Sequence, residues 1–397
     1  MPAATPFTNL LGGMASWFLF WGTSQVMFQW LVVEGLGAPA TLVGTAQMAM
    51  MLPSLLFVLI GGAAADRLDP RRVLLVVHFL TAAVAGALCF LVVRDELSYE
   101  WLIGYALAVG TLQAFGMPAR DTQLSDVVRH AGLSRAVAGL TMVQHMAQMC
   151  GAFIGGLATF AGPGPIIASQ AAFLLVGTGF VARLPGRPKA PDEPRKPIRL
   201  QELREGLLEV VRSPILRPVF LLSITTGMFF IGPFLVILPL IVRDVYGGGA
   251  GEMGILTGMF PLGAVGGGAV IVSRGGIERN GRALAIGQIL GATSIASIGI
   301  GLPFEGTALS VLLWGVSGSL FINTGRTLFQ QHASAENRGR VLSVYTLGLM
   351  GASPFGSVLS GALAEPLGLH GTLVFSAVTA GAAAAVLCLT TRLWSLR

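Results

Sequence analysis

Apolar runs long enough to cross a bilayer recur along the whole 397-residue chain. A bilayer core of about 30 Å needs about 20 apolar residues in a helix, and a helix satisfies its own backbone hydrogen bonds in lipid. The pattern therefore predicts an all-α integral membrane protein with twelve transmembrane helices. The approximate spans are 10–33, 41–64, 73–93, 101–118, 137–160, 165–183, 216–242, 253–273, 283–303, 307–325, 341–363 and 371–391.

One long polar interruption divides these runs into two sets of six. Residues 184–214 begin with closely spaced prolines and charges and become amphipathic from about Leu200 to Val211. Such a segment is typical of a linker that ends in a short interfacial helix. We expect an N-terminal six-helix bundle over 1–183, a cytoplasmic linker over 184–214 and a C-terminal six-helix bundle over 215–397.

Composition supports the membrane interpretation and the charges orient it. The chain is 53% hydrophobic and 11% charged, whereas soluble domains carry about 25% charged residues. The formal charge is +6. With the N-terminus inside, all of the Lys and Arg residues except Arg94 and Arg243 fall on the cytoplasmic side. The positive-inside rule then predicts two cytoplasmic termini, and it explains the basic charge without a nucleic-acid partner.

The two halves carry related features, which indicates an internal duplication. The matching positions are Asp66-Arg67 with Glu278-Arg279 at an offset of 212, and Arg120 with Arg326 and Gly155 with Gly361 at an offset of 206. Parallel six-helix repeats form one known transporter design, in which the substrate site lies near the midplane. The repeat therefore favours two pseudo-symmetric six-helix bundles.

The stretch from Gly62 to Arg72 resembles the signature between helices two and three of the major facilitator superfamily. That signature is a Gly, three residues, Asp-Arg, a short turn and basic residues; here Asp69-Pro70 stands where the family usually has a Gly. Ile241–Ala250 and Glu336–Val341, with Pro354 and Gly361 beyond them, resemble the transmembrane secretion effectors, bacterial exporters related to the enterobactin exporter. The resemblance covers essentially the whole chain. It implies a multi-pass transporter of the bacterial inner (cell) membrane.

Charged loop residues are the first candidates for function. An acid such as Asp66 at a helix end can pair with neighbouring arginines and with the N-terminus of another helix. In the family setting we expect a gating latch, and the alternative is a topology determinant on a solvated turn. The gating motif comprises Gly62, Asp66, Arg67, Arg71, Arg72, Glu278, Arg279, Gly281 and Arg282. By the same analogy, the cytoplasmic gate comprises Arg120, Asp121, Arg326, Arg338 and Arg340.

Polar residues on apolar helices are the candidates for the substrate cavity. Trp17, Trp21, Gln25 and Gln29 follow one another at i,i+4 spacing and share one helix face. Amides in a membrane helix favour a watery cavity or a partner helix over lipid. Because helices one, four, seven and ten line the cavity in the family, the resemblance adds Gln113 and Asn323. Hydrogen bonding between helices, away from substrate, is the alternative.

Coupling and packing residues complete the set. No acidic residue lies in the middle of any run, which leaves Glu34, Asp121 and His145 as candidates for proton coupling, with a structural role as the alternative for His145. Helix five ends in glycines that resemble an antiporter signature, with Ala152 where a Pro is expected. Tight packing without directional meaning is the alternative. The packing residues are Gly151, Gly155, Gly156 and Gly361.

The sequence favours transport over catalysis. It contains no P-loop, no His/Glu metal pair and no nucleophile elbow in a suitable context, so we expect no enzyme, no cofactor and no metal. We expect a monomeric secondary transporter that exports a small organic molecule, siderophore-like or drug-like, by alternating access and proton antiport. The alternatives are an importer or facilitator of the same fold, and a membrane receptor or enzyme that does not transport.

Overall fold

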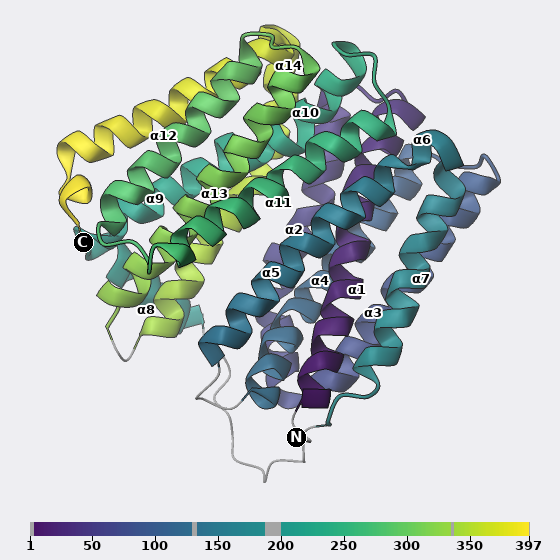
Figure 1. Ribbon diagram of the computed structural model, residues 1–397, viewed down its shortest axis with the longest axis horizontal. Coiled ribbons are helices and arrows are strands. Elements are labelled where there is room, and N and C mark those ends of the chain that lie inside the picture. The colour runs from purple at the N-terminus through teal and green to yellow at the C-terminus, as the bar shows by residue number, and fades with distance from the viewer. Residues whose placement is uncertain (1–3, 129–132, 187–199, 335–336, 397) are drawn as a thin grey trace. The chain divides into compact units, whose positions relative to one another are not determined.

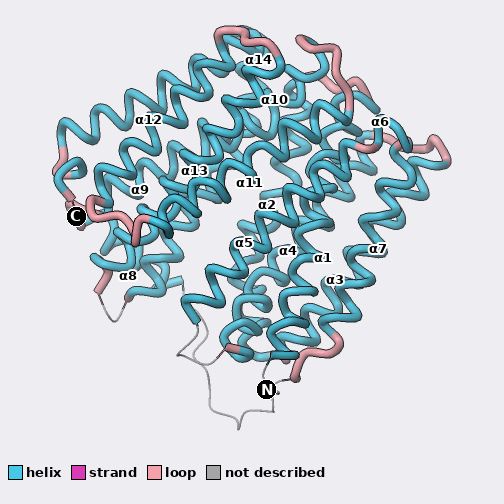
Figure 2. Tube along the Cα trace, viewed as in Figure 1, coloured by secondary structure: helices cyan, strands magenta, loops and turns pink. Residues whose placement is uncertain are grey.

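The regular structure of the chain is entirely helical in the residues that the computed structural model describes, 4–128, 133–186, 200–334 and 337–396 (Figure 1, Figure 2). Eight of the described helices are long and apolar enough to cross a membrane. One of these eight, α14, is two helices joined at Gly368, which has a left-handed φ of 69°. The predicted all-α, multi-pass membrane fold is confirmed at this level.

Apart from the stretch between α7 and α8, the helices follow one another with short connections. Two π-helical turns, η1 and η3, continue α1 and α9 without a break in the helical path. The bounds are α1 Ala4–Trp30, η1 Leu31–Gly35, α2 Ala40–Arg67, α3 Pro70–Val93, α4 Tyr99–Val127, α5 Leu133–Gly156, α6 Ala158–Ala161, α7 Pro163–Val181, α8 Leu200–Arg212, α9 Leu216–Thr226, η3 Gly227–Ile231, α10 Gly232–Asp244, α11 Ala250–Ser273, α12 Asn280–Gly299, α13 Phe304–His332, α14 Arg338–Thr390 and η4 Leu393–Ser395.

The chain forms two compact units whose boundaries cut through two helices. The first unit takes residues 1–36, 49–197 and 248–258, and the second takes 37–48, 198–247 and 259–397. The beginning of α2 therefore belongs to the second unit, and the beginning of α11 belongs to the first. The two units therefore do not correspond simply to the sequence before the linker and the sequence after it.

Close backbone approaches hold the first unit together. Helix α1 packs on α5 and α7, and α3 packs on α4 and α7. A Cβ added at Gly22 would overlap the carbonyl of Gln148, and one at Gly151 would overlap the carbonyl of Leu19. Thr23 Oγ1 donates to the Gly151 carbonyl at 3.0 Å. Small residues thus let α1 and α5 meet backbone to backbone, as is usual for membrane helices.

The second unit is built in the same way around α12, α13 and α14. A Cβ at Gly263 would overlap the carbonyl of Leu312, and one at Gly361 would overlap the carbonyl of Ala40. Near the ends of α9 and α13 a cluster of large buried side chains, which includes Phe329 at 0% exposure, fills the interior. The core of this unit therefore combines glycine contacts with ordinary apolar packing.

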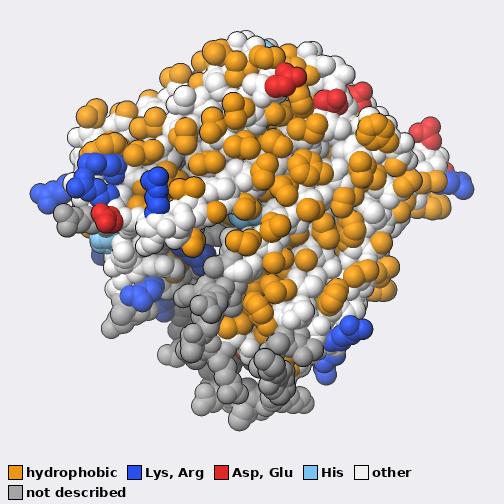
Figure 3. Space-filling model, in the orientation of Figure 1, with side chains coloured by type: hydrophobic (Ala, Val, Ile, Leu, Met, Phe, Trp, Pro, Cys, Tyr) orange, Lys and Arg blue, Asp and Glu red, His pale blue; other side chains and the backbone are white. Residues whose placement is uncertain are grey.

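The visible surface is largely apolar along the helices. In Figure 3 hydrophobic side chains cover the exposed sides of the helices, while Lys, Arg, Asp and Glu gather at helix ends. Phe160 and Leu389 are 87% and 86% exposed. Such apolar exposure is costly in water and expected against lipid.

Candidate functional site

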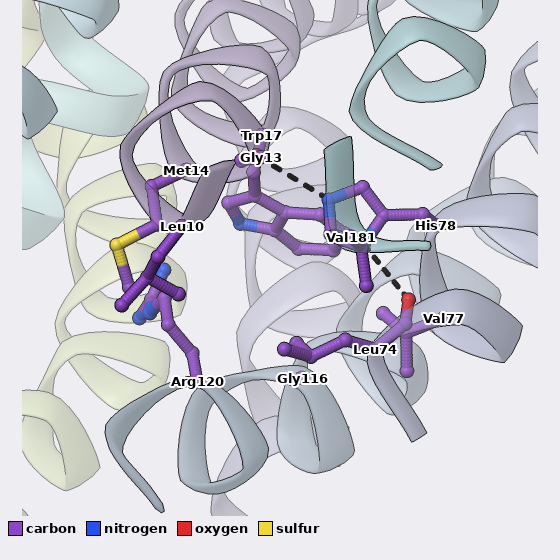
Figure 4. A pocket seen from close by; sticks show the side chains of 10 residues that line it. All are labelled: Leu10, Gly13, Met14, Trp17, Leu74, Val77, His78, Gly116, Arg120 and Val181. Atoms are coloured by element: carbon purple, nitrogen blue, oxygen red, sulfur yellow. Dashed lines mark hydrogen bonds between the residues drawn. The ribbon is translucent and has the colours of Figure 1, made fainter. Parts of the chain in front are cut away.

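A small cavity lies inside the first unit, among α1, α3, α4 and α7. Its volume is about 20 Å³, room for a single water molecule rather than for an organic substrate. Figure 4 shows Trp17 of α1, His78 of α3 and Arg120 of α4 among the side chains around it. The remaining lining residues are Leu10, Gly13, Met14, Leu74, Val77, Gly116 and Val181.

His78 is the buried titratable group of this cavity, with 3% of its surface exposed. Its Nδ1 lies 2.8 Å from the carbonyl oxygen of Leu74 on its own helix. Its Nε2 lies 3.4 Å from the carbonyl oxygen of Gly13 on α1. The imidazole and the Trp17 indole are 5.3 Å apart between centroids. A Cβ added at Gly177 of α7 would lie 2.9 Å from the imidazole Cδ2, so that glycine makes space for the ring.

Arg120, a predicted gate residue, is half-buried and contributes to this cavity. Its guanidinium carbon lies 4.9 Å from the centroid of the Phe18 ring, a cation–π contact. Asp121, the next residue, is exposed. Arg326, the repeat counterpart on α13, is also exposed. The two arginines that the sequence treats as equivalent therefore occupy different surroundings.

The structure places the predicted cavity residues at different depths. Trp17 is buried against His78, and Gln29 is buried with an Nε2 that has no hydrogen-bond partner. Trp21, Gln25 and Gln113 are half-buried, whereas Asn323 is exposed and donates to the Ser319 carbonyl at 2.7 Å. Of this set, only Trp17 lines the cavity that His78 and Arg120 share.

The loop between α2 and α3 is organised by Asp69, the residue at which the chain departs from the superfamily signature. Its carboxylate caps α3 by accepting from the Arg71 backbone N–H at 3.1 Å, and Pro70 fills the first helical position. The Arg71 side chain donates to the Ala182 carbonyl. Arg72 lies 3.9 Å from Asp69 and is largely exposed.

The remaining residues of the motif between α2 and α3 make fewer contacts that explain their identity. Arg67 is exposed and Gly62 is half-buried. The side chain of Asp66, the predicted latch, lies outside the described residues. Gly61 is the glycine of close approach, because a Cβ there would overlap the Ala114 carbonyl of α4. The signature includes Gly62 but not Gly61, so the sequence did not identify the glycine that makes this close contact.

The corresponding turn before α12 is held by the C-terminal segment. The Arg282 guanidinium lies 5.1 Å from the centroid of the Trp394 ring. A Cβ at Gly281 would overlap the Leu393 carbonyl, whereas Glu278 and Arg279 are exposed. Leu393 and Trp394 belong to no recognisable motif, so the sequence alone does not identify them.

Two glutamates of α8 bind neighbouring parts of the chain, Glu209 the loop between α13 and α14, and Glu205 the first turn of α14. Glu209 accepts from the Ser334 backbone N–H at 2.8 Å and from Asn337 Nδ2 at 2.9 Å. Glu205 pairs with Arg340 at 2.7 Å, while Arg338 is exposed. Desolvation alone would raise the pKa of Glu209, but the hydrogen bonds from Ser334 and Asn337 outweigh it and hold that pKa below its ordinary value. Arg340, predicted at a gate, thus anchors the linker helix.

The predicted coupling residues also differ in surroundings. Glu34 and Asp121 are exposed, and His145 is half-buried with an Nδ1 that has no hydrogen-bond partner. Within the described part of the chain, no group of three or more His, Cys, Asp and Glu side chains could hold a metal ion. Among the described residues of the first unit, the buried histidine is His78, which belongs to no motif visible in the sequence.

The predicted packing glycines all lie at close contacts. A Cβ at Gly155 would lie 2.7 Å from the Val26 side chain, and one at Gly156 would lie 3.4 Å from the Gly254 Cα. Gly151 and Gly361 face backbone carbonyls, as described above. Close packing explains why glycine occupies these four positions.

Comparison with known proteins establishes the family. Residues 9–396 match the family described as transmembrane secretion effector, and the chain belongs to that family of the major facilitator superfamily. It is similar to the multidrug efflux pump Tap of Mycobacterium tuberculosis, with 28% identity over 89% of this chain and 85% of that protein. It is also similar to the staphyloferrin A transporter of Staphylococcus aureus, with 23% identity over 89% of each chain.

Solved structures agree on the fold. The nucleoside transporter NupG superposes with a TM-score of 0.77 at 14% sequence identity, covering 96% of this chain and 98% of NupG. At that identity the likeness concerns the fold alone. The family match shows that the chain is a multi-pass membrane transporter of the major facilitator type and not an enzyme.

Proposed function

We propose that the protein is a secondary active exporter of small organic molecules, drug-like or siderophore-like, driven by proton antiport. The observation that carries the proposal is the whole-length family match, together with similarity to a multidrug efflux pump and to a siderophore transporter. The indoles and amides of the α1 face suit an amphipathic organic substrate better than a simple ion. Import or facilitated diffusion by the same fold is the alternative.

We further propose twelve membrane spans in two related bundles, with both termini cytoplasmic in a bacterial inner membrane. One pair of turns supports the duplication. Gly37 precedes α2 and Gly247 precedes α11, 210 positions apart, and both adopt a left-handed φ of 60°. That backbone conformation favours glycine. The offset agrees with those of the sequence repeat.

In this mechanism the charged motif between α2 and α3 acts on the conformational equilibrium rather than on the substrate. Asp66 and the loop arginines form the latch, and Arg120, Asp121 and Arg326 belong to the cytoplasmic gate. Proton binding and substrate binding alternate as the cavity opens to one side and then to the other.

An efflux assay in a bacterial host that lacks its own drug pumps tests the direction of transport. We predict that cells making the protein accumulate less ethidium than control cells, and that a protonophore removes the difference. Greater accumulation in the producing cells would identify an importer. A difference that survives the protonophore would contradict proton coupling.

A further inference from the structure

We propose that His78 is the proton-coupling residue of this transporter, an inference that rests on the proposed antiport. His78 is the only His, Asp, Glu, Lys or Arg side chain that is buried among the residues the structure describes. An ionisable group enclosed at membrane depth is costly and is normally retained for a function. The exposed Glu34 and Asp121 lack that enclosure.

The two ring nitrogens of His78 define two states. A neutral imidazole has one N–H and one lone pair, whereas an imidazolium has two N–H donors. Both nitrogens here face backbone carbonyls, Leu74 at 2.8 Å and Gly13 at 3.4 Å. Since a carbonyl oxygen only accepts, the neutral ring can satisfy just one of them. Protonation forms the second N–H bond and lets the ring donate to both.

The second hydrogen bond joins different helices. Leu74 belongs to the same helix as His78, but Gly13 belongs to α1, four residues before Trp17. The long Nε2 contact would tighten on protonation and relax on proton release, which changes how α1 is held against α3. Because α1 carries Trp17, Trp21, Gln25 and Gln29 on one face, this link connects proton binding to the helix that we expect to contact substrate.

The ring borders a small cavity whose lining is largely apolar. The volume of this cavity is about 20 Å³, the size of one water molecule. Arg120 of α4 lines the same cavity as His78, and its like charge opposes a positive charge on the ring. The parts of α1 and α7 against the ring, Gly13, Trp17 and Gly177, carry no titratable side chain. Burial and, to a lesser extent, Arg120 favour the neutral ring, whereas the carbonyl oxygens of Leu74 and Gly13 favour the protonated ring.

Purified protein in liposomes tests the assignment with ethidium as the probe. In the wild type, a pH gradient that is acidic inside should drive ethidium uptake beyond equilibration. His78→Gln keeps a neutral donor of similar size, so it should lose at least tenfold of the gradient-driven uptake while ethidium counterflow without a gradient stays within twofold. His145→Gln tests the rival candidate, a half-buried histidine of the same unit, and should retain gradient-driven uptake.

Each result bears on one claim. Coupling that survives His78→Gln, or that is lost in His145→Gln alone, overturns the role of His78 and leaves antiport intact. A wild type that ignores the gradient contradicts antiport itself, and His78 with it. If His78→Gln also fails in counterflow, Gly177→Ala decides the matter, because its methyl group would press on the ring. An unchanged pH profile of uptake in that variant overturns the proposal, and a shifted midpoint supports it.

Discussion

At the scale of single residues, Asp66 offers the sharpest test of the latch. We predict that Asp66→Asn slows ethidium transport by roughly 5–150-fold, corresponding to a coupling free energy of about 1–3 kcal/mol, while ethidium binding to the purified protein stays unchanged. The reason is that the carboxylate biases a conformational equilibrium and does not touch the substrate. Wild-type turnover in this variant would leave Asp66 with a topological role only.

Asp69→Asn is the matched control on the same loop. Asparagine can still cap α3 through its side-chain oxygen, so we expect transport close to that of the wild type. A transport loss as large as that of Asp66→Asn would mean that the whole loop, rather than one carboxylate, sets the rate.

What the sequence could predict at this scale depended on recognisable spacing. The Asp-Arg motif and the polar face of α1 were visible because they recur at fixed intervals. His78 was not identified, since its significance comes from the Gly13 carbonyl, which belongs to another helix 65 positions away. Arg120 and Arg326 match in sequence, yet only Arg120 packs on an aromatic ring, because Phe18 lies beside it.

At the scale of helices, the contact between α1 and α5 depends on Gly151. We predict that Gly151→Ala lowers the stability of the first unit by about 1–3 kcal/mol, because the new methyl group would overlap the Leu19 carbonyl. The measurement is the thermal unfolding midpoint in detergent. Gly139→Ala on the same helix is the control, since nothing lies within 4 Å of the added methyl. It should be neutral or stabilising; equal losses in both variants would refute the packing argument.

The attachment of α8 gives a pH-dependent prediction. Because the pKa of Glu209 is lower in the folded protein, its contribution is fully present above the ordinary glutamate pKa and is lost as the pH falls through the lowered value. Glu209→Gln should cost on the order of 1 kcal/mol near neutral pH, measured by thermal unfolding, and the difference from wild type should shrink in acid. The exposed Glu305→Gln is the control. A cost for Glu209→Gln that does not change with pH would contradict this account.

The sequence predicts where helices lie along the chain. It predicts less well which residues of a helix pack against a neighbouring helix. The amphipathic period predicted a helix from about Leu200 to Val211, and α8 spans Leu200–Arg212. The predicted span 216–242 corresponds to one apolar span, Leu216–Asp244, within which the π-helical turn η3 lies between α9 and α10. Apolar length sets where a helix begins and ends, but only the neighbouring helix decides whether Gly61 or Gly62 must be small.

At the scale of the whole molecule, topology comes first. We predict that a cysteine at Glu305, at the exposed start of α13, reacts with an impermeant thiol reagent added outside intact cells. A cysteine at Asp192, in the linker and outside the described residues, should not react. The background for both is a variant without Cys89, Cys150 and Cys388. The reverse labelling pattern would overturn the cytoplasmic assignment of the linker and the termini.

Proton antiport is the central claim, and liposomes that enclose a pH-sensitive dye test it most directly. Ethidium is added outside purified protein in these liposomes, with no pH gradient imposed. If substrate entry drives protons out, the internal pH should rise as ethidium enters, and protein-free liposomes should show no such rise. Ethidium entry with constant internal pH would indicate a facilitator, and a fall in internal pH would indicate symport. Either result would contradict proton antiport.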